Sequence, residues 1–83
     1  MYDYQVEREW LFTDEGQRMF LRIRDNVNEL LNRAGAARMQ EALCGSGSSW
    51  RQMACMDRMV ELKEIREIPQ NSCAGQHRVF VRN

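Results

Sequence analysis

The stretch that decides the fold reads SSWRQMACMDRMVELKEIREIPQNSCAGQHRVFVR and runs from Ser48 to Arg82. Near its start, Ser49 and Gln52 stand at the spacing of a capping box, which predicts the beginning of a helix. At 100° per residue, one side of this helix gathers the apolar residues Met53, Met56, Met59 and Val60. We therefore expect an amphipathic helix that ends at Lys63 and packs this methionine-rich side on the core.

The rest of the stretch predicts two strands joined by a turn. The first strand covers Glu64–Ile68 and ends at Pro69, because proline cannot donate to a strand ladder. The segment through Gln76 is rich in Pro, Asn, Ser and Gly, as turns and loops are. The second strand covers residues 77–82 and puts its two valines on one face and three side chains on the other: Arg78, Phe80 and Arg82. Two strands alone are marginally stable, so we expect them to pack on the helices.

Two more helices are predicted before this stretch. Thr13 or Asp14 caps the first, whose apolar residues recur every three or four positions: Met19, Phe20, Ile23, Val27, Leu30, Leu31 and Ala34. Gly35 ends this helix as its C-cap. A short second helix is predicted over residues 36–44, and the Gly- and Ser-rich residues 45–49 break it.

The first twelve residues form an N-terminal arm whose structure the pattern leaves open. Tyr2, Tyr4 and Val6 alternate with polar residues, as in a strand, whereas Tyr2, Val6 and Trp10 have the spacing of one helix face. The arm either packs on the core of its own chain or reaches a second subunit to make a homodimer. We divide the chain into this arm, residues 1–12, and one domain, residues 13–83.

Composition places the chain among small globular proteins. Apolar residues make up 43% and charged residues 29% of the 83 residues, values that are typical of a folded domain. No apolar run is long enough to span a membrane, and no secretory leader opens the sequence. Three cysteines without a Cys-x-x-Cys motif indicate reduced thiols, so we expect a cytoplasmic protein.

The sequence offers no convincing catalytic or metal site. Its single histidine, His77, follows Cys73 at a spacing that is irregular for zinc, so no metal is expected. The same pair lies on a predicted loop with little room for a pocket, and no paired carboxylates suggest acid–base chemistry. We therefore expect a protein that is not an enzyme and that has no cofactor.

Three helices followed by a β-hairpin resemble the winged helix-turn-helix superfamily. The most specific likeness is MDRMVELKEIREI, from Met56 to Ile68, where a recognition helix of that family leads directly into its wing. Such proteins often have glycine where this chain has Lys63. The resemblance implies an α+β, mainly helical fold, a three-helix winged helix-turn-helix with a C-terminal β-hairpin wing. Many members also place a small strand between the first two helices. Only Gly35 and its neighbours separate these helices here, so a third strand would have to come from residues 1–12.

The resemblance also implies which residues bind a partner. In DNA-binding members the recognition helix enters the major groove and the wing touches the minor groove or the backbone. The helix candidates are Ser48, Ser49, Trp50, Arg51, Gln52, Ala54 and Arg58. Of these, the serines suit phosphate, Arg51 suits guanine and Gln52 suits adenine. The wing candidates are Asn71, Gln76, His77 and Arg78.

The charge pattern leaves two kinds of partner open. The chain has zero net charge, with −4 on residues 1–15 and +4 on the remainder. On the predicted outward face of the third helix, Asp57 and Glu61 balance Arg51 and Arg58, whereas DNA-binding faces are usually basic. Trp50 on that face is either a cap over the core or an anchor for a protein partner. We expect a small transcriptional regulator of bacterial or phage type that binds double-stranded DNA. The alternative is a phage-related winged-helix module that binds another protein instead.

Overall fold

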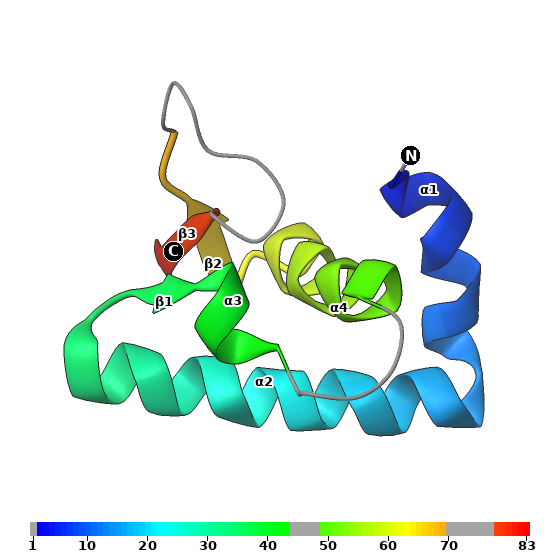
Figure 1. The fold of residues 1–83 in the computed structure, drawn as a ribbon, viewed down its shortest axis with the longest axis horizontal. Coiled ribbons are helices and arrows are strands. Elements are labelled where there is room, and N and C mark those ends of the chain that lie inside the picture. The colour runs from blue at the N-terminus through cyan, green and yellow to red at the C-terminus, as the bar shows by residue number, and fades with distance from the viewer. Residues whose placement is uncertain (1, 44–48, 70–77) are drawn as a thin grey trace.

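The long helix α2, Asp14–Ala34, forms the base of the molecule in Figure 1, a computed structural model that describes residues 2–43, 49–69 and 78–83. The Thr13 hydroxyl accepts a hydrogen bond from the Gly16 backbone N–H, which caps the start of α2. At the other end Gly35 takes the left-handed conformation, with φ 78°, and donates to the Leu31 carbonyl. Both predicted ends of this helix are confirmed, and so are most of its core-facing positions: Phe20, Ile23, Val27, Leu30 and Leu31.

The segment after Gly35 differs from the prediction. Where a helix was expected over residues 36–44, the chain forms strand β1, Ala37–Arg38, and then the four-residue helix α3, Met39–Ala42. Pairing with the last strand decides this, because Ala37 faces Phe80 and the Met39 N–H donates to the Arg78 carbonyl at 2.8 Å. The intrinsic helix preference of this segment is worth only tenths of a kcal/mol per residue, roughly, and tertiary pairing overrides it.

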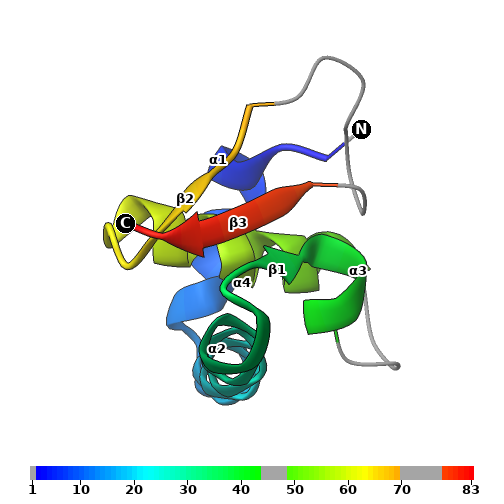
Figure 2. The same ribbon diagram turned by 90° about the vertical axis from the view of Figure 1, so that its left-hand side faces the viewer.

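Helix α4, Ser49–Glu61, begins where the capping-box spacing predicted and leads into the sheet. Strand β2, Ile65–Glu67, and strand β3, Val79–Arg82, form an antiparallel hairpin, and β3 also pairs with β1. The strand order is β1-β3-β2, with β3 in the middle (Figure 2). The third strand therefore comes from between α2 and α3, and the expectation that residues 1–12 would have to supply it is wrong.

The turn between α4 and β2 has one unusual backbone conformation. Lys63 has φ 63°, which lies in the left-handed region that glycine occupies most readily. Its N–H donates to the Val60 carbonyl, and the next N–H, of Glu64, donates to the Met59 carbonyl. These bonds end α4 and turn the chain toward the sheet, as a left-handed residue after a helix commonly does.

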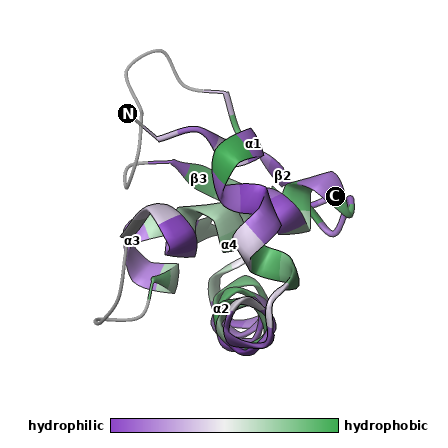
Figure 3. Cartoon of the chain, turned by 90° about the vertical axis from the view of Figure 1, so that its right-hand side faces the viewer, coloured by the Kyte–Doolittle hydropathy of each residue, from purple (hydrophilic) through white to green (hydrophobic). Residues whose placement is uncertain are grey.

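The arm is helical and packs on its own chain. It consists of the short helix α1, Tyr4–Glu7, and the 3-10 helix η1, Arg8–Phe12, which ends next to the start of α2. Leu11 is only 1% exposed and belongs to the core. Seen from the side of the arm, α1 lies in front of α4 and above α2 (Figure 3). Of the two alternatives for the arm, the structure has the one in which it packs on the core of the same chain.

The arm explains why α4 is covered on more than one side. Met56 and Met59 are fully buried, as predicted from the wheel, and Met53 and Val60 pack against the core while partly exposed. Ala54, however, is also fully buried although the wheel placed it on the outward side. This prediction failed because α4 contacts α1 and η1 as well as α2 and β2.

The whole is an α+β fold, mainly helical, with one small antiparallel sheet. Its core joins the buried residues of α2 and α4 to Ile65 of β2 and Phe80 of β3. Within residues 2–43, 49–69 and 78–83, no helix has both the length and the apolar character needed to cross a membrane.

Candidate nucleic-acid interface on α4 and β3

The predicted binding residues are only partly brought together. Ser48, Asn71, Gln76 and His77 lie outside the described residues. Ser49 is the first residue of α4. The remaining candidates lie on α4 or directly before β3, and their exposure to solvent differs. They are Trp50, Arg51, Gln52, Arg58 and Arg78.

Gln52 does not belong to an exposed surface. Gln52 is only 2% exposed, so the prediction that its side chain reaches an adenine is wrong for the folded chain. Gln52 lies three residues before Cys55 and four before Met56, on the same side of α4 as these two buried side chains. The spacing of Gln52 from these residues along the helix indicates that it is buried, whereas its capacity to form hydrogen bonds had suggested a contact with DNA.

Two cations on α4 lie against aromatic rings of the arm. The guanidinium of Arg51 is 4.6 Å from the centre of the Trp10 ring, and that of Arg58 is 5.1 Å from the Phe12 ring. A third cation, Arg8 of the arm itself, also lies 5.1 Å from the Phe12 ring. Such contacts are attractive because the ring face carries negative charge. The arm thus covers the two arginines that were expected to contact DNA from α4.

Arg78 forms part of a network that connects four segments of the chain. Its guanidinium donates to Asp57 of α4 at 2.6 and 3.2 Å and to Glu67 of β2 at 2.9 and 3.0 Å. Asp57 also accepts a hydrogen bond of 2.5 Å from the Tyr2 hydroxyl. The side chains of Arg78 and Asp57 are only 16% and 15% exposed, so little water competes for these bonds. The predicted wing residue Arg78 therefore joins the arm, α4 and the sheet.

Burial and hydrogen bonding shift the pKa values in this network. Burial alone would lower the pKa of Arg78, but the hydrogen bonds to Asp57 and Glu67 outweigh it and raise that pKa. For Tyr2, burial and the hydrogen bond to Asp57 both raise the pKa of the phenol. Arg78 therefore stays charged and Tyr2 stays neutral at any physiological pH.

Glu61 holds a second cluster at the exposed edge of α4. Its carboxylate accepts from the Tyr4 hydroxyl at 2.7 Å, from Arg58 at 2.6 Å and from Arg8 at 3.0 Å. These hydrogen bonds, that of Tyr4 foremost, lower the pKa of Glu61 from 4.5 to about 2. Burial and the bond to Glu61 raise the pKa of Tyr4 to about 12. Glu61 thus connects the arm to α4 through three donors.

The low pKa of Glu61 predicts a contribution to stability that depends on pH. The folded pKa lies below the unfolded one, so this contribution is present above about pH 4.5 and is lost as pH falls toward about 2. We expect wild-type protein to lose more stability than Glu61→Gln between about pH 5 and pH 2.5 in urea unfolding. Because the Glu61 side chain is 34% exposed, water reduces the difference.

A control for this pH prediction is Glu29→Gln, whose carboxylate is 73% exposed and lies 4.0 Å from Arg33. This variant should follow the pH dependence of the wild type. Parallel curves for Glu61→Gln and wild type across the acid range would contradict the role of Glu61.

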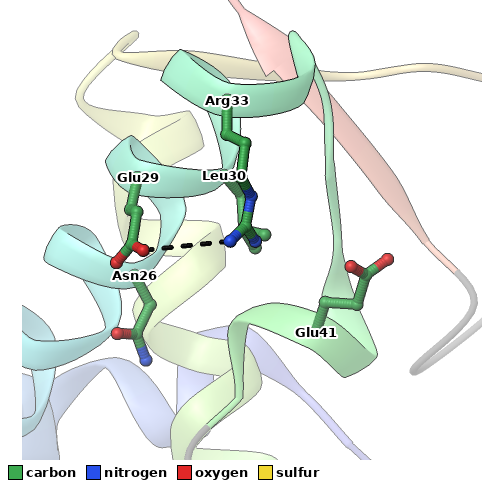
Figure 4. Close-up of a pocket in the computed structure, with 5 residues that line it drawn as sticks. All are labelled: Asn26, Glu29, Leu30, Arg33 and Glu41. Atoms are coloured by element: carbon green, nitrogen blue, oxygen red, sulfur yellow. Dashed lines mark ion pairs between the residues drawn. The ribbon is translucent and has the colours of Figure 1, made fainter.

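A separate hollow lies between α2 and α3 (Figure 4). Its lining is Asn26, Glu29, Leu30, Arg33 and Glu41. Arg33 and Glu29 face each other across one turn of α2, and both side chains are largely exposed. Within the described part of the chain, no three side chains of His, Cys, Asp or Glu gather in a way that could hold a metal ion.

The contacts that sequence reasoning missed are those between the arm and α4. The aromatic residues of the arm were evident, but their partners lie far along the chain, 55 residues away for Tyr2 and Asp57. No local spacing signals such a pair. The balance of charges on α4 was visible in sequence, and the structure shows each of its carboxylates engaged by the arm.

Comparisons with known proteins add no relative. A scan against models of protein families finds no match, and searches of curated proteins and of solved structures find no similar protein.

Proposed function

We propose that this chain is a winged-helix domain that binds double-stranded DNA and regulates transcription in the cytoplasm, without catalytic activity. The connectivity carries the proposal. A helix, a short strand, two helices and a hairpin follow one another, and the short strand pairs with the last one. From α2 onward this order resembles that of winged-helix proteins, many of which place a small strand between the first two helices. Lys63 supports it, because its left-handed φ of 63° occurs where such proteins often have glycine.

In this proposal the N-terminal half of α4 makes the contact with DNA. Trp50 at its start is 43% exposed, and Arg51 is next to it. The start of a helix carries partial positive charge and unpaired backbone N–H groups, which favour phosphate. An arginine on such a helix can bind either phosphate or the edge of guanine in the major groove.

Titration of the protein against mixed-sequence duplex DNA tests this proposal. The affinity should fall at least tenfold, roughly, between about 50 and 200 mM salt, because each phosphate contact releases counterions. Arg51→Ala should lower the affinity by about tenfold, the loss of one arginine contact. Arg18→Ala, an exposed cation in the first half of α2, is the matched control and should change it less than twofold, roughly. Absence of binding at low salt would contradict the proposal.

A second candidate function is supported by a specific observation. Trp50 at the start of α4 is exposed, while Asp57, Arg58 and Glu61 further along this helix, and Arg78 before β3, are already paired with one another or with the arm. An exposed tryptophan suits a contact with another protein, in which a few aromatic anchors dominate the affinity. A protein that binds no DNA at low salt would support this function instead.

Homodimerisation through the arm stays a prediction. The arm contacts its own chain through Leu11, Tyr2 and Tyr4. In a dimer, the arm would either keep these contacts and bind a second subunit through its outer surface, or make the same contacts with the second subunit instead. A mass measurement in solution at several concentrations distinguishes a monomer from a dimer.

A further inference from the structure

We propose that the N-terminal arm, Tyr2–Phe12, competes with DNA for the outward face of α4, so that docking of the arm and entry of α4 into the major groove exclude each other. This inference rests on the proposed function and adds to it how access to the site is controlled.

One helix alone fills the width of the major groove. The major groove is about 12 Å wide, and one helix with its side chains already has a diameter of about 10–12 Å. The groove therefore admits α4 alone and not α4 with a second segment packed on it. In the structure α1 and η1 both contact α4, and Tyr2 and Tyr4 reach Asp57 and Glu61, two residues of its predicted outward side. The arm has to leave before that side of α4 can enter the groove.

The arm also engages the charged groups of α4. Trp10 and Phe12 of the arm cover Arg51 and Arg58, the two cations of α4 that DNA would bind. The arm also carries the exposed carboxylates of Asp3 and Glu9. A segment with negative charge and ring faces offers an arginine the same attractions that phosphates and bases offer. The arm therefore occupies the binding groups of α4 as well as the space in front of it.

The two ends of the arm are held differently. Helix α1 has no buried residue. The hydrogen bond from Tyr4 to Glu61 is exposed, that from the preceding Tyr2 to Asp57 is partly buried, and both tyrosine rings pack against the core while staying partly exposed. Leu11 of η1, in contrast, is 1% exposed and anchored in the core. The outer part of the arm can thus detach while Leu11 keeps the fold intact. The apparent affinity for DNA is then reduced in proportion to the fraction of molecules in which the arm is open.

Amide hydrogen exchange of the full chain, measured by NMR with and without duplex DNA at low salt, tests the competition. Saturating DNA should speed exchange of the α1 amides by about tenfold or more, because a detached helix of four residues does not keep its backbone hydrogen bonds. An arm that stays protected in the DNA complex would overturn the inference while leaving the proposed function standing.

Substitutions provide the second measurement. Phe12→Ala uncovers Arg58 and should raise DNA affinity about threefold or more by increasing the open fraction. Leu21→Ala is the matched control, since Leu21 of α2 is 53% exposed and Phe12 is 52% exposed, and it should leave the affinity unchanged. Tyr2→Phe with Tyr4→Phe removes only the two hydroxyl contacts, with little risk to folding, and should act in the same direction. Unchanged affinity in both arm variants would overturn the inference. Absence of DNA binding in every variant, Phe12→Ala included, would instead remove the proposed function on which it rests.

Discussion

Gly16→Ala is expected to lower the free energy of unfolding by about 3 kcal/mol, the upper part of the range for overpacked sites. A Cβ atom at Gly16 would lie 2.1 Å from the Trp10 carbonyl oxygen and 2.7 Å from the Leu11 Cα. Both atoms are backbone, so no side chain can rotate away, and η1 would have to separate from α2. Alanine favours a helix over glycine by only about 1 kcal/mol, so the clash outweighs this gain.

Gly35→Ala is the control that distinguishes the effect of a steric clash from the effect of backbone conformation. Gly35 has φ +78°, and a Cβ atom there would meet nothing within 4 Å. Its cost is therefore the strain of the left-handed conformation alone, about 1 kcal/mol. Urea unfolding of both variants measures the difference. A Gly16→Ala protein as stable as the wild type would contradict the close approach of the arm to α2.

Arg78→Met is expected to destabilise the protein by about 2 kcal/mol. The substitution removes a guanidinium that is 16% exposed and leaves Asp57 and Glu67 without their shared counter-charge. Removing one partner of a fully buried pair costs about 3–5 kcal/mol, and the partial exposure of Glu67, 37%, reduces this value. If Arg78 only contacted DNA, the substitution would lower affinity and leave stability unchanged, which a urea titration distinguishes.

Two further variants sharpen this measurement. Arg33→Met removes an exposed arginine 4.0 Å from Glu29 and should change stability by less than about 0.5 kcal/mol. Combining Asp57→Asn with Arg78→Met gives a double-mutant cycle, whose coupling energy should exceed about 0.5 kcal/mol for residues in direct contact. Simple additivity would show that the pair contributes nothing specific.

Helices α2 and α4 could be predicted from sequence because their signals are local. The cap at Thr13, the left-handed Gly35 and the apolar spacing of α2 are each set by residues within a few positions of one another. The same holds for the methionine-rich side of α4. Strand β1 could not be predicted, because Ala37 and Arg38 are extended through pairing with Phe80 and Val79 at the far end of the chain.

The candidate site was less predictable than the fold. Gln52 could have been placed inside from its position beside Cys55 and Met56 on the helix wheel. The engagement of Arg78 by Asp57 and Glu67 could not, because it depends on how β3 lies against α4. Charge counting showed that the region was nearly neutral, but only the three-dimensional arrangement shows which carboxylate neutralises which arginine.

The central position of β3 has a consequence for how this chain folds as it is made. Ala37 of β1 pairs with Phe80 of β3, so this pairing cannot form until β3 has left the ribosome. At about 5–20 residues per second, the intervening stretch takes seconds to appear. During that time α2 and α4 are complete, while the place in the core that Phe80 of β3 fills stays open to water. Closing the sheet is a late, long-range step, and contacts of such high sequence separation slow folding.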